Sequence, residues 1–388
     1  MTDSGECDGL SRSWNTVRLG DVAVVHYGRA RPSSDNGPVP VVGSGGIYAW
    51  TSHAYFDRPT LVIGRKGTAG RAWLIEMPSW PSDTAFYLGL SGAVDLRYVY
   101  YCLCHTPLSG EHARTTLPSL SRSDVEEYTF SCPPLPEQRA IAHVLDTVQR
   151  AREATERVIA ATRELKRSLM RHLFTYGPVP IHEADKVPLK ETEIGMVPEE
   201  WEVLPLGELV SVHDKKRIPV SAEKRSRMRG PYPYCGANGI VDFVDDFLFE
   251  GEYVLLAEDG GRWGGYEESA YVMKGRFWVN NHAHIIQALE GVTLNAYVVQ
   301  VLNYMDISRY ISGTTRGKLN QGVMKSLPLP VLPLDVQQAV AHALRTVDEK
   351  LEAEKNRKQA LEALFQSLLH NLMTGKLRVN VDSMEVAE

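Results

Sequence analysis

Cysteine is scarce in this chain, with five among 388 residues, an odd number at scattered positions. Such a set does not suit a disulfide framework and favours a protein that stays reduced in the cytoplasm. Long apolar runs are missing too, because no stretch approaches the roughly 20 apolar residues that a membrane-spanning helix needs. The N-terminal segment is polar and lacks the apolar core of a secretory signal. These absences predict a cytoplasmic protein with no part in a membrane.

Catalytic motifs are also absent. Gly43–Gly46 follows an apolar run, as a nucleotide-binding loop does, but the next residues favour a strand instead of the helix that would hold a phosphate. No phosphate loop ending in Gly-Lys-Ser/Thr occurs. Ser131–Pro134 resembles the Pro-Pro motif of amino-methyltransferases, but Leu135 stands where an aromatic side chain should hold the base. We therefore expect no active site and no cofactor.

Metal-binding patterns are equally sparse. Cys102, Cys104 and His105 lie close together, but no second ligand pair stands at a spacing typical of zinc sites. Glu258 and Asp259 resemble part of a metal site, yet the corresponding residues in the first half of the chain are basic. We expect no bound metal. The net charge of −6 argues against nucleic-acid binding over the whole surface and leaves room for a local basic face.

What the chain does contain is a duplicated helical segment. Residues 136–175 match residues 335–374 without a gap at an offset of 199, and seven of eleven positions are identical between Gln138–Val148 and Gln337–Val347. Both copies repeat apolar residues at alternating steps of four and three, which is typical of helices that pair along a seam. We expect these positions to pair the two helices: Ile141, Leu145, Val148, Ile159, Leu169, Leu173, Val340, Leu344, Val347, Leu351, Leu361, Phe365, Leu368 and Leu372.

The duplication extends to the segments before each helix, at offsets that grow in small steps from 187 through 193 to 198. The matching stretches are Trp14–Asp21 with Trp201–Glu208, Gly37–Ile47 with Gly230–Ile240, Thr60–Arg71 with Tyr253–Gly264, and Ser79–Leu88 with Phe277–Ile286. A period this long indicates two related domains and not a solenoid of short repeats.

Each globular half is predicted to be a compact α+β domain. Short β-rich runs punctuated by glycine and proline, such as Pro40–Val42, Thr60–Ile63 and Tyr253–Leu256, alternate with helical patches at Leu96–Cys104 and Leu294–Tyr304. The predicted organisation is a globular domain at 1–133, a helix at 134–176, a proline-bearing linker at 177–200, a second globular domain at 201–332, a second helix at 333–378 and a tail at 379–388.

The short linker constrains how the helices pair. Each domain joins the N-terminal end of its own helix, and a helix of 40 residues is about 60 Å long. An antiparallel pair places the end of the first helix beside the start of the second, where the second domain must lie, whereas a parallel pair would force the linker back along the whole length. We therefore predict an antiparallel pair with a domain at either end and an approximate two-fold axis.

The loops between matched segments differ between the two copies, as expected for two related domains that read different sequences. Arginine can read guanine, asparagine can read adenine, and lysine mostly holds phosphate. The candidate DNA-binding residues are Arg65, Lys66, Thr68, Arg71, Arg114, Thr115, Thr116, Ser121, Arg122, Lys215, Lys216, Arg217, Arg262, Thr314, Thr315, Arg316, Lys318 and Asn320.

Three segments resemble a known family. Leu189–Leu209 (LKETEIGMVPEEWEVLPLGEL) is similar to the start of its second recognition domain, Pro133–Asp146 (PPLPEQRAIAHVLD) to the start of its first conserved helix, and Leu368–Val379 (LLHNLMTGKLRV) to the end of its second. The family is that of the specificity subunits of type I restriction–modification enzymes, and the similarity covers nearly the full length. Asp335 and Val336 depart from the proline and glutamate that usually open the second helix, which affects a helix start and not recognition.

The resemblance implies two target-recognition domains that each read one half of a bipartite DNA site. It also implies that the helices set the spacer and dock two methylation subunits, which carry S-adenosylmethionine chemistry and bring in the restriction and translocation subunits. Two alternatives stay open at this point. One is a two-headed adaptor that binds proteins, which predicts apolar patches in place of basic clefts. The other is an autonomous DNA-modifying enzyme.

Overall fold

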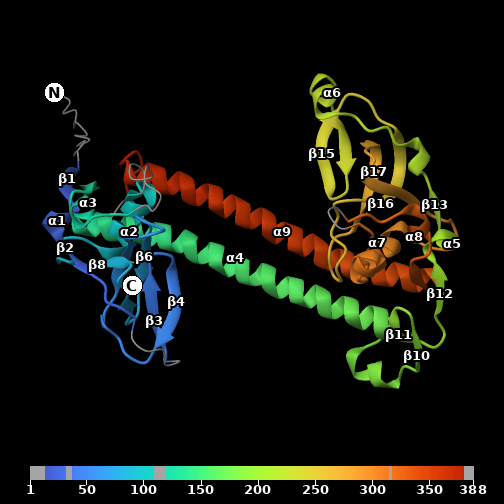
Figure 1. Cartoon of the computed structure of the whole chain (residues 1–388), viewed down its shortest axis with the longest axis horizontal. Helices are drawn as coiled ribbons and strands as arrows, with labels where there is room; N and C mark the ends of the chain where they lie inside the picture. The colour runs from blue at the N-terminus through green and yellow to red at the C-terminus, as the bar shows by residue number, and fades with distance from the viewer. Residues whose placement is uncertain (1–13, 32–36, 109–118, 314–316, 380–388) are drawn as a thin grey trace, which may run out of the picture. The chain divides into compact units, whose positions relative to one another are not determined.

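The computed structural model describes residues 14–31, 37–108, 119–313 and 317–379, whose elements are labelled in Figure 1. The chain divides into two compact units. The first comprises Met1–Glu156 with Asn356–Glu388, and the second comprises Arg157–Lys355. Each unit therefore contains one globular domain and one end of either long helix.

The domain of the first unit contains a four-stranded, a three-stranded and a two-stranded sheet among its described residues. The four-stranded sheet is antiparallel with the order β2–β8–β5–β6, the three-stranded sheet has the order β4–β3–β7, and β1 pairs with β9. Central strand β5 is buried along its whole length, as its run of apolar residues predicts. The elements are β1 Asn15–Arg18, α1 Leu19–Val22, β2 Ala23–Tyr27, β3 Val39–Gly43, β4 Gly46–Thr51, β5 Thr60–Gly64, β6 Ala72–Ile75, β7 Trp80–Pro81, β8 Ala85–Leu90, α2 Leu96–His105, α3 Arg122–Glu126 and β9 Thr129–Cys132.

The domain of the second unit repeats this plan with longer strands. Its six-stranded sheet has the order β13–β18–β16–β17–β14–β15, and β12 pairs with β19 as β1 pairs with β9. The elements are β12 Glu202–Pro205, α5 Leu206–Leu209, β13 Val210–Val212, η3 Asp214–Lys216, α6 Ala222–Arg227, β14 Tyr232–Gly236, β15 Gly239–Val244, β16 Phe249–Ala257, β17 Ala270–Val279, β18 Ala283–Ala288, α7 Asn295–Tyr304, η4 Ser308–Tyr310, α8 Gln321–Lys325 and β19 Pro328–Val331.

The two domains share individual hydrogen bonds as well as topology. In the first unit, the Asp95 amide donates to Gln138 Oε1 at 2.8 Å, and Gln138 Nε2 donates to the Pro133 carbonyl at 2.9 Å. In the second, Gln337 Oε1 accepts from the Leu294 amide at 3.1 Å, and its Nε2 donates to the Leu332 carbonyl at 2.8 Å. Both glutamines are buried. In each unit one glutamine thus fixes the start of the long helix to the domain beside it.

The predicted linker contains regular structure. It forms η2 (Ile181–Lys186) and a hairpin of β10 (Leu189–Thr192) and β11 (Gly195–Pro198). Gly195 has a φ of +104° at the turn, which a residue with a Cβ rarely adopts. Val197 of the hairpin is buried in the core of the second unit. This segment therefore packs as part of the second domain.

The long helices are α4 (Leu135–Tyr176) and α9 (Leu334–Met373), and they run antiparallel within each unit. In the first unit, Arg152 pairs with Glu362 and, four residues further along α4, Glu156 pairs with Lys358 at 2.8 Å, four residues back along α9. The predicted antiparallel arrangement is confirmed in this unit.

The second unit shows the same arrangement. Lys166 pairs with Asp348 at 2.5 Å, and the core brings Leu173 of α4 together with Val340 and Leu344 of α9. As the residue number of the contacting residue rises along α4, that of its partner falls along α9, so the two helix ends are antiparallel here as well.

Most of the predicted helix-pairing residues are buried, and many also contact the domain core. Those in the core of the first unit or packed on it are Ile141, Leu145, Val148, Phe365, Leu368 and Leu372. Those in or on the core of the second unit are Leu169, Leu173, Val340 and Leu344. Ile159 and Leu351 are buried outside these two cores, whereas Val347 and Leu361 are only half-buried. The apolar stripe thus secures each helix end to a domain as well as to the other helix.

Candidate nucleic-acid interface

In the first unit, two of the predicted loops lie side by side. The Leu120 amide donates to the Arg65 carbonyl at 2.9 Å, and Lys66 and Ser119 form an isolated antiparallel bridge. The loop after β5 is therefore fixed against the segment that leads into α3. Together these loops carry six predicted DNA-binding residues: Arg65, Lys66, Thr68, Arg71, Ser121 and Arg122.

Aromatic rings orient two of the three arginines of this surface. The guanidinium of Arg65 lies 5.1 Å from the ring centroid of Tyr27 and 5.8 Å from that of Phe86. Arg71, which is exposed, lies 4.2 Å from the ring centroid of Trp73. Cation–π contacts at exposed sites contribute about 0.5–1 kcal/mol and leave the positive charge available to an anion.

The other residues of this surface are exposed, and two have local partners. The Ser121 hydroxyl accepts from the Asp124 amide at 3.1 Å as the N-cap of α3, and Arg122 pairs with Glu126 at 2.6 Å. Exposed pairs of this kind stabilise a protein by at most about 1 kcal/mol, so Arg122 can exchange its carboxylate for a phosphate at small cost. Lys66 and Thr68 are exposed.

The second unit makes the same contact between loops with different side chains. The Leu319 amide donates to the Glu258 carbonyl at 2.7 Å, and Asp259 and Lys318 form the isolated bridge. The Glu258 carboxylate pairs with Arg217 and, at 3.1 Å, with Lys318. The loop after β16 thus lies beside the segment that leads into α8, as its counterpart lies beside the segment leading into α3.

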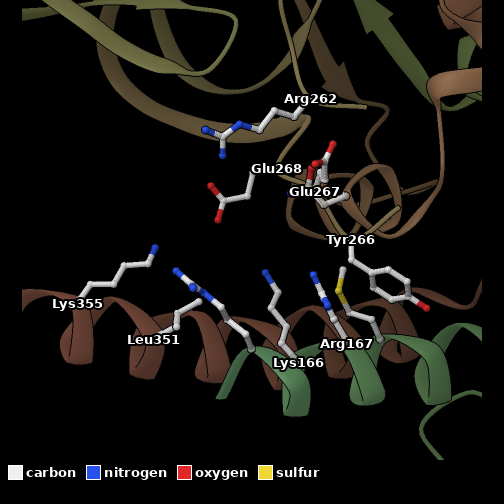
Figure 2. Close-up of a pocket in the computed structure, with 11 residues that line it drawn as sticks. Lys166, Arg167, Arg262, Tyr266, Glu267, Glu268, Leu351 and Lys355 are labelled. Carbon is white, nitrogen blue, oxygen red and sulfur yellow. The ribbon is translucent and has the colours of Figure 1, made fainter. Parts of the chain in front are cut away.

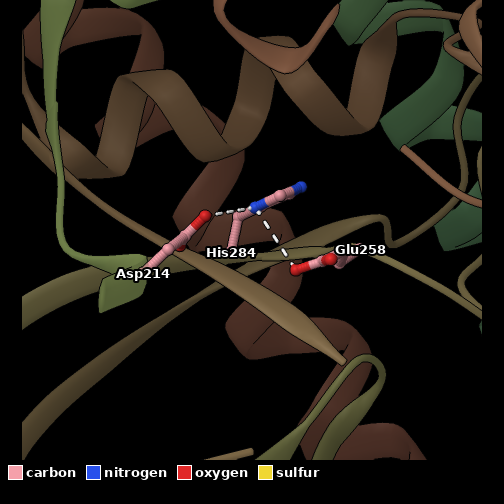
Figure 3. A group of neighbouring side chains, drawn as sticks. All are labelled: Asp214, Glu258 and His284. Carbon is pink, nitrogen blue, oxygen red and sulfur yellow. Dashed lines mark hydrogen bonds and ion pairs between the residues drawn. The ribbon is translucent and has the colours of Figure 1, made fainter. Parts of the chain in front are cut away.

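A buried network supports this loop pair, and Figure 3 shows three of its members. His284 lies with Nδ1 2.6 Å from Asp214 Oδ2 and with Nε2 2.7 Å from the Leu319 carbonyl. Asp214 also accepts from the Ile285 amide and from Gln321 Nε2, each at 2.8 Å. Burial alone would raise the pKa of Asp214, but the hydrogen bonds from His284 and the Ile285 amide outweigh it, so this pKa is lowered.

Asp214, Glu258 and His284 have the composition of a metal site, with one ligand atom from each lying within 4.8 Å of the others. The chemistry around them does not fit a cation, however. Both ring nitrogens of His284 face oxygen acceptors, and Arg217 and Lys318 already occupy the Glu258 carboxylate. Both carboxylates and both ring nitrogens therefore already have protein partners, and the cluster is a closed polar network.

The first unit has three different side chains at the same three places. At the offsets of the duplicated sequence, Asp214 corresponds to Tyr27, Glu258 to Arg65 and His284 to Phe86. The first unit thus holds an arginine between aromatic rings where the second holds a glutamate among basic groups. We call these two groups the aromatic trio (Tyr27, Arg65, Phe86) and the ionic trio (Asp214, Glu258, His284).

The structure places the remaining predicted residues in different settings. Lys215 and Lys216 are exposed in η3, and Asn320 is the exposed residue just before α8, with its Nδ2 donating to Ser312 at 3.2 Å. Arg262 lines a pocket beside α4 and α9. Six predicted residues lie outside the described residues: Arg114, Thr115, Thr116, Thr314, Thr315 and Arg316.

The sequence predicts Arg217 as a DNA-binding residue and gives no indication that it pairs with buried Glu258. Its side chain is 15% exposed and pairs with Glu258, and it also donates to the Ala283 carbonyl at 2.8 Å. Asp214 and His284 were not singled out. The available signal was a histidine inside the apolar run that starts β18, because a buried polar side chain needs a partner.

Comparison with known proteins agrees with this architecture. The family described as "Type I restriction modification DNA specificity domain" matches residues 11–162 and 198–363, which together make up most of the chain. The chain belongs to this family of specificity subunits, which is the recognition class and not the catalytic class of these systems. The two matched ranges are the two halves of the internal duplication.

Individual relatives have the same description. A putative type I restriction enzyme specificity subunit of Haemophilus influenzae is 35% identical over 37% of this chain and 36% of its own length. The MjaVIII specificity subunit of Methanocaldococcus jannaschii is 25% identical over 74% of this chain and 71% of its own length. The crystal structure of an S subunit from M. genitalium matches with a TM-score of 0.72 at 17% identity, covering 94% of this chain and 97% of that one.

None of the helices in the described ranges combines the length and the apolar character of a membrane-spanning segment.

Proposed function

We propose that each globular unit reads one half of a bipartite sequence in double-stranded DNA. The observation that carries this proposal is the contrast between the two trios. A shared scaffold keeps its hydrogen bonds at Gln138 and Gln337, yet holds opposite charges at Arg65 and Glu258 beneath the same loop pair. Two domains that read different sequences need a constant scaffold with variable chemistry where base edges are met.

In the first unit, the exposed loop residues Lys66, Thr68 and Arg71 are the proposed contacts, and Arg65 is held beside them by the rings of Tyr27 and Phe86. In the second unit, Lys215, Lys216, Lys318 and Asn320 take this part, with the ionic trio behind them. Lysine side chains position phosphates, whereas asparagine and arginine can also read base edges. Arg217 supports the loop through Glu258 and is not among the proposed base readers.

The long helices are proposed to set the spacer between the half-sites and to dock two methylation subunits. A solved structure that matches this fold, with a TM-score of 0.50 at 14% identity, comes from work on complex assembly of a type I restriction–modification system. Through the methylation subunits the chain would recruit the restriction and translocation subunits. It would act on cellular DNA in the cytoplasm and need no cofactor of its own.

Methylated-base sequencing tests the proposal. Host DNA is sequenced after expression of the methylation subunit gene with and without this chain. We expect a bipartite methylated motif with a fixed non-specific spacer only when the chain is present. If the same motifs appear in both samples, the assignment to DNA recognition is wrong and a protein-binding adaptor becomes the better account.

A further inference from the structure

The second unit contains a second charged feature, a pocket of about 350 Å³ between the loop from β16 to β17 and the two long helices (Figure 2). Five basic side chains line it: Arg163, Lys166, Arg167, Arg262 and Lys355. The acidic residues among those that line the pocket are Glu267 and Glu268, in a chain of net charge −6. We call it the basic pocket.

Two of the five cations are not neutralised by protein groups. Lys166 pairs with Asp348 at 2.5 Å, Arg167 with Glu164 at 3.2 Å, and Lys355 with Glu352 at 3.3 Å. Across the part of the chain that the structure describes, Arg163 and Arg262 form no ion pair, and both are exposed. Like charges gathered without counterions repel one another. An anion from another molecule would relieve this repulsion.

The loop that closes the pocket is held in a strained conformation. Tyr266 has a φ of +65°, and it is the one residue other than glycine with a positive φ in the described ranges. Its amide donates to the Tyr304 carbonyl at 3.4 Å, and its ring meets that of Tyr304 edge-on at 5.5 Å. Backbone strain of this kind persists where the surroundings enforce it and is concentrated at binding sites.

The basic pocket has no counterpart in the first unit. At the offsets of the duplication, the helix residues Arg163, Lys166 and Arg167 and the loop residue Arg262 correspond to positions without a cation. The counterparts of Arg163, Lys166 and Arg167 are Glu362, Phe365 and Gln366. The counterpart of Arg262 is Ala69, and that of Lys355 is Glu156. The basic side chains are therefore not required by the shared scaffold, because the same fold forms without them.

We infer that the basic pocket binds a phosphate group of the DNA backbone beside the half-site read by the second unit, an inference that rests on the proposed function. Chain continuity favours this ligand over an acidic protein segment. Asp259, three residues before Arg262, forms the bridge with Lys318 of the proposed DNA-binding loops, and Gly260 accepts from Asn238 at 3.0 Å. The inferred phosphate contact is thus specific to the second unit.

The test uses the full chain assembled with its methylation subunits and a fluorescent duplex of unrelated sequence. Binding is followed by anisotropy over a series of KCl concentrations for wild type and for R163A/R262A. Each lost phosphate contact removes about 0.9 from the slope of log affinity against log salt. For one phosphate we expect the magnitude of the slope to fall by about 0.9 and the affinity at low salt to fall roughly tenfold.

Two controls separate the pocket from general effects. R157A/K186A removes two exposed basic residues of the second unit that do not line the pocket, so it has the same net charge and should keep the wild-type slope. R163K/R262K keeps the positive charges and should restore most of the slope. A fall that the lysine variant rescues and that the control does not share supports the inference.

Three results would overturn it. An unchanged slope in R163A/R262A excludes a DNA phosphate from the pocket. An unchanged slope with weaker assembly of the methylation subunits assigns the pocket to an acidic protein segment. Calorimetric binding of inorganic pyrophosphate that R163A/R262A abolishes, again with an unchanged slope, assigns it to a free phosphate compound. The methylated motif would keep its sequence in all three cases, with a lower fraction of methylated sites in the second, so failure here is distinct from failure of the proposed function.

Discussion

Gln138 and Gln337 stand at corresponding positions of the two units and make the same buried hydrogen bonds, whereas Arg65 and Glu258, which also correspond, carry opposite charges. The difference shows which positions packing constrains. A glutamine that satisfies amides and carbonyls at a helix start has no simple replacement, because each group left unpaired in the interior costs about 1–3 kcal/mol. A side chain that supports a loop can change as long as its neighbours change with it.

The largest loss of stability should come from replacing His284 with phenylalanine, the residue that stands at the corresponding position, Phe86, in the first unit. His284→Phe removes the Nδ1 contact to buried Asp214 and the Nε2 contact to the Leu319 carbonyl, and each buried group left unpaired costs about 1–3 kcal/mol, with more for a charged one. Hydrogen exchange of the full chain, read at β18 for the second unit and at β8 for the first, measures both units in one molecule. We expect a loss of protection at β18 and little change at β8.

His342→Phe is the matched control, because His342 is exposed on α9 in the same unit. It should change the protection of β18 by less than about 0.5 kcal/mol, as surface substitutions usually do. Equal protection in the His284 and His342 variants would show that the ionic trio is not a stabilising network.

Replacing either of the two corresponding glutamines should give the next largest loss of stability, in the unit that carries the substitution. Gln138→Leu and Gln337→Leu each strand buried amide and carbonyl groups, with an expected cost of about 2–4 kcal/mol in the unit that carries the change. The Gln337 substitution should reduce stability more than the Gln138 substitution, because Gln337 Oε1 also accepts from the Thr293 hydroxyl at 2.9 Å. Loss of protection in only one of the two variants would contradict an equivalent role for the two residues.

Much of the fold was accessible from the sequence because duplication supplies its own alignment. Offsets of 187, 193 and 198 located the strands, and the stripe from Val340 to Leu372 located the second helix. The hairpin at Leu189–Pro198 was not expected, since its flanking prolines look like those of a linker. The burial of Val197 in the core of the second unit and the hydrogen bond from Arg309 to the Glu193 carbonyl show that it is folded onto the second domain.

The site was less accessible for a physical reason. Asp214 and His284 are 70 residues apart, and their contact depends on strand pairing that no local pattern encodes. Arg217 looked like one member of a basic run with Lys215 and Lys216, and only the fold turns it toward Glu258. Exposed loop residues such as Lys66 could be predicted as candidates, because loops at corresponding places differ between the two halves.

Low pH should reduce the stability of the second unit through Asp214. The aromatic trio of the first unit contains no carboxylate, so it should give no such pH dependence. The pKa of Asp214 is lowered on folding, so its contribution to stability is present above its unfolded pKa, about 3.9, and is lost as pH falls through the lower folded value. Hydrogen exchange at β18, measured from about pH 5 downward, should show a steeper loss in wild type than in Asp214→Asn. Parallel profiles would mean that Asp214 does not supply this dependence.

The smallest effects should come from exposed loop cations, each confined to one half-site. Lys66→Ala/Arg71→Ala and Lys215→Ala/Lys216→Ala each remove two positive charges, one pair per unit. A lost base contact costs about 1–3 kcal/mol and a lost phosphate contact less. Methylated-base sequencing should show a relaxed first half-site for one variant and a relaxed second half-site for the other. A uniform decline of both halves in either variant would indicate phosphate holding without base reading.

The central claim is that the two domains recognise DNA independently and can be exchanged on the shared scaffold. It is tested most directly by replacing residues 201–332 with a second copy of residues 14–133. The bonds of Gln337 to the domain beside it have counterparts at Gln138, so the copied domain should dock on α9. Methylated-base sequencing with this chain is expected to reveal a symmetric bipartite motif, in which the first half-site appears twice in inverted orientation. An unchanged asymmetric motif would contradict the account, because sequence reading would then not reside in the exchanged domain.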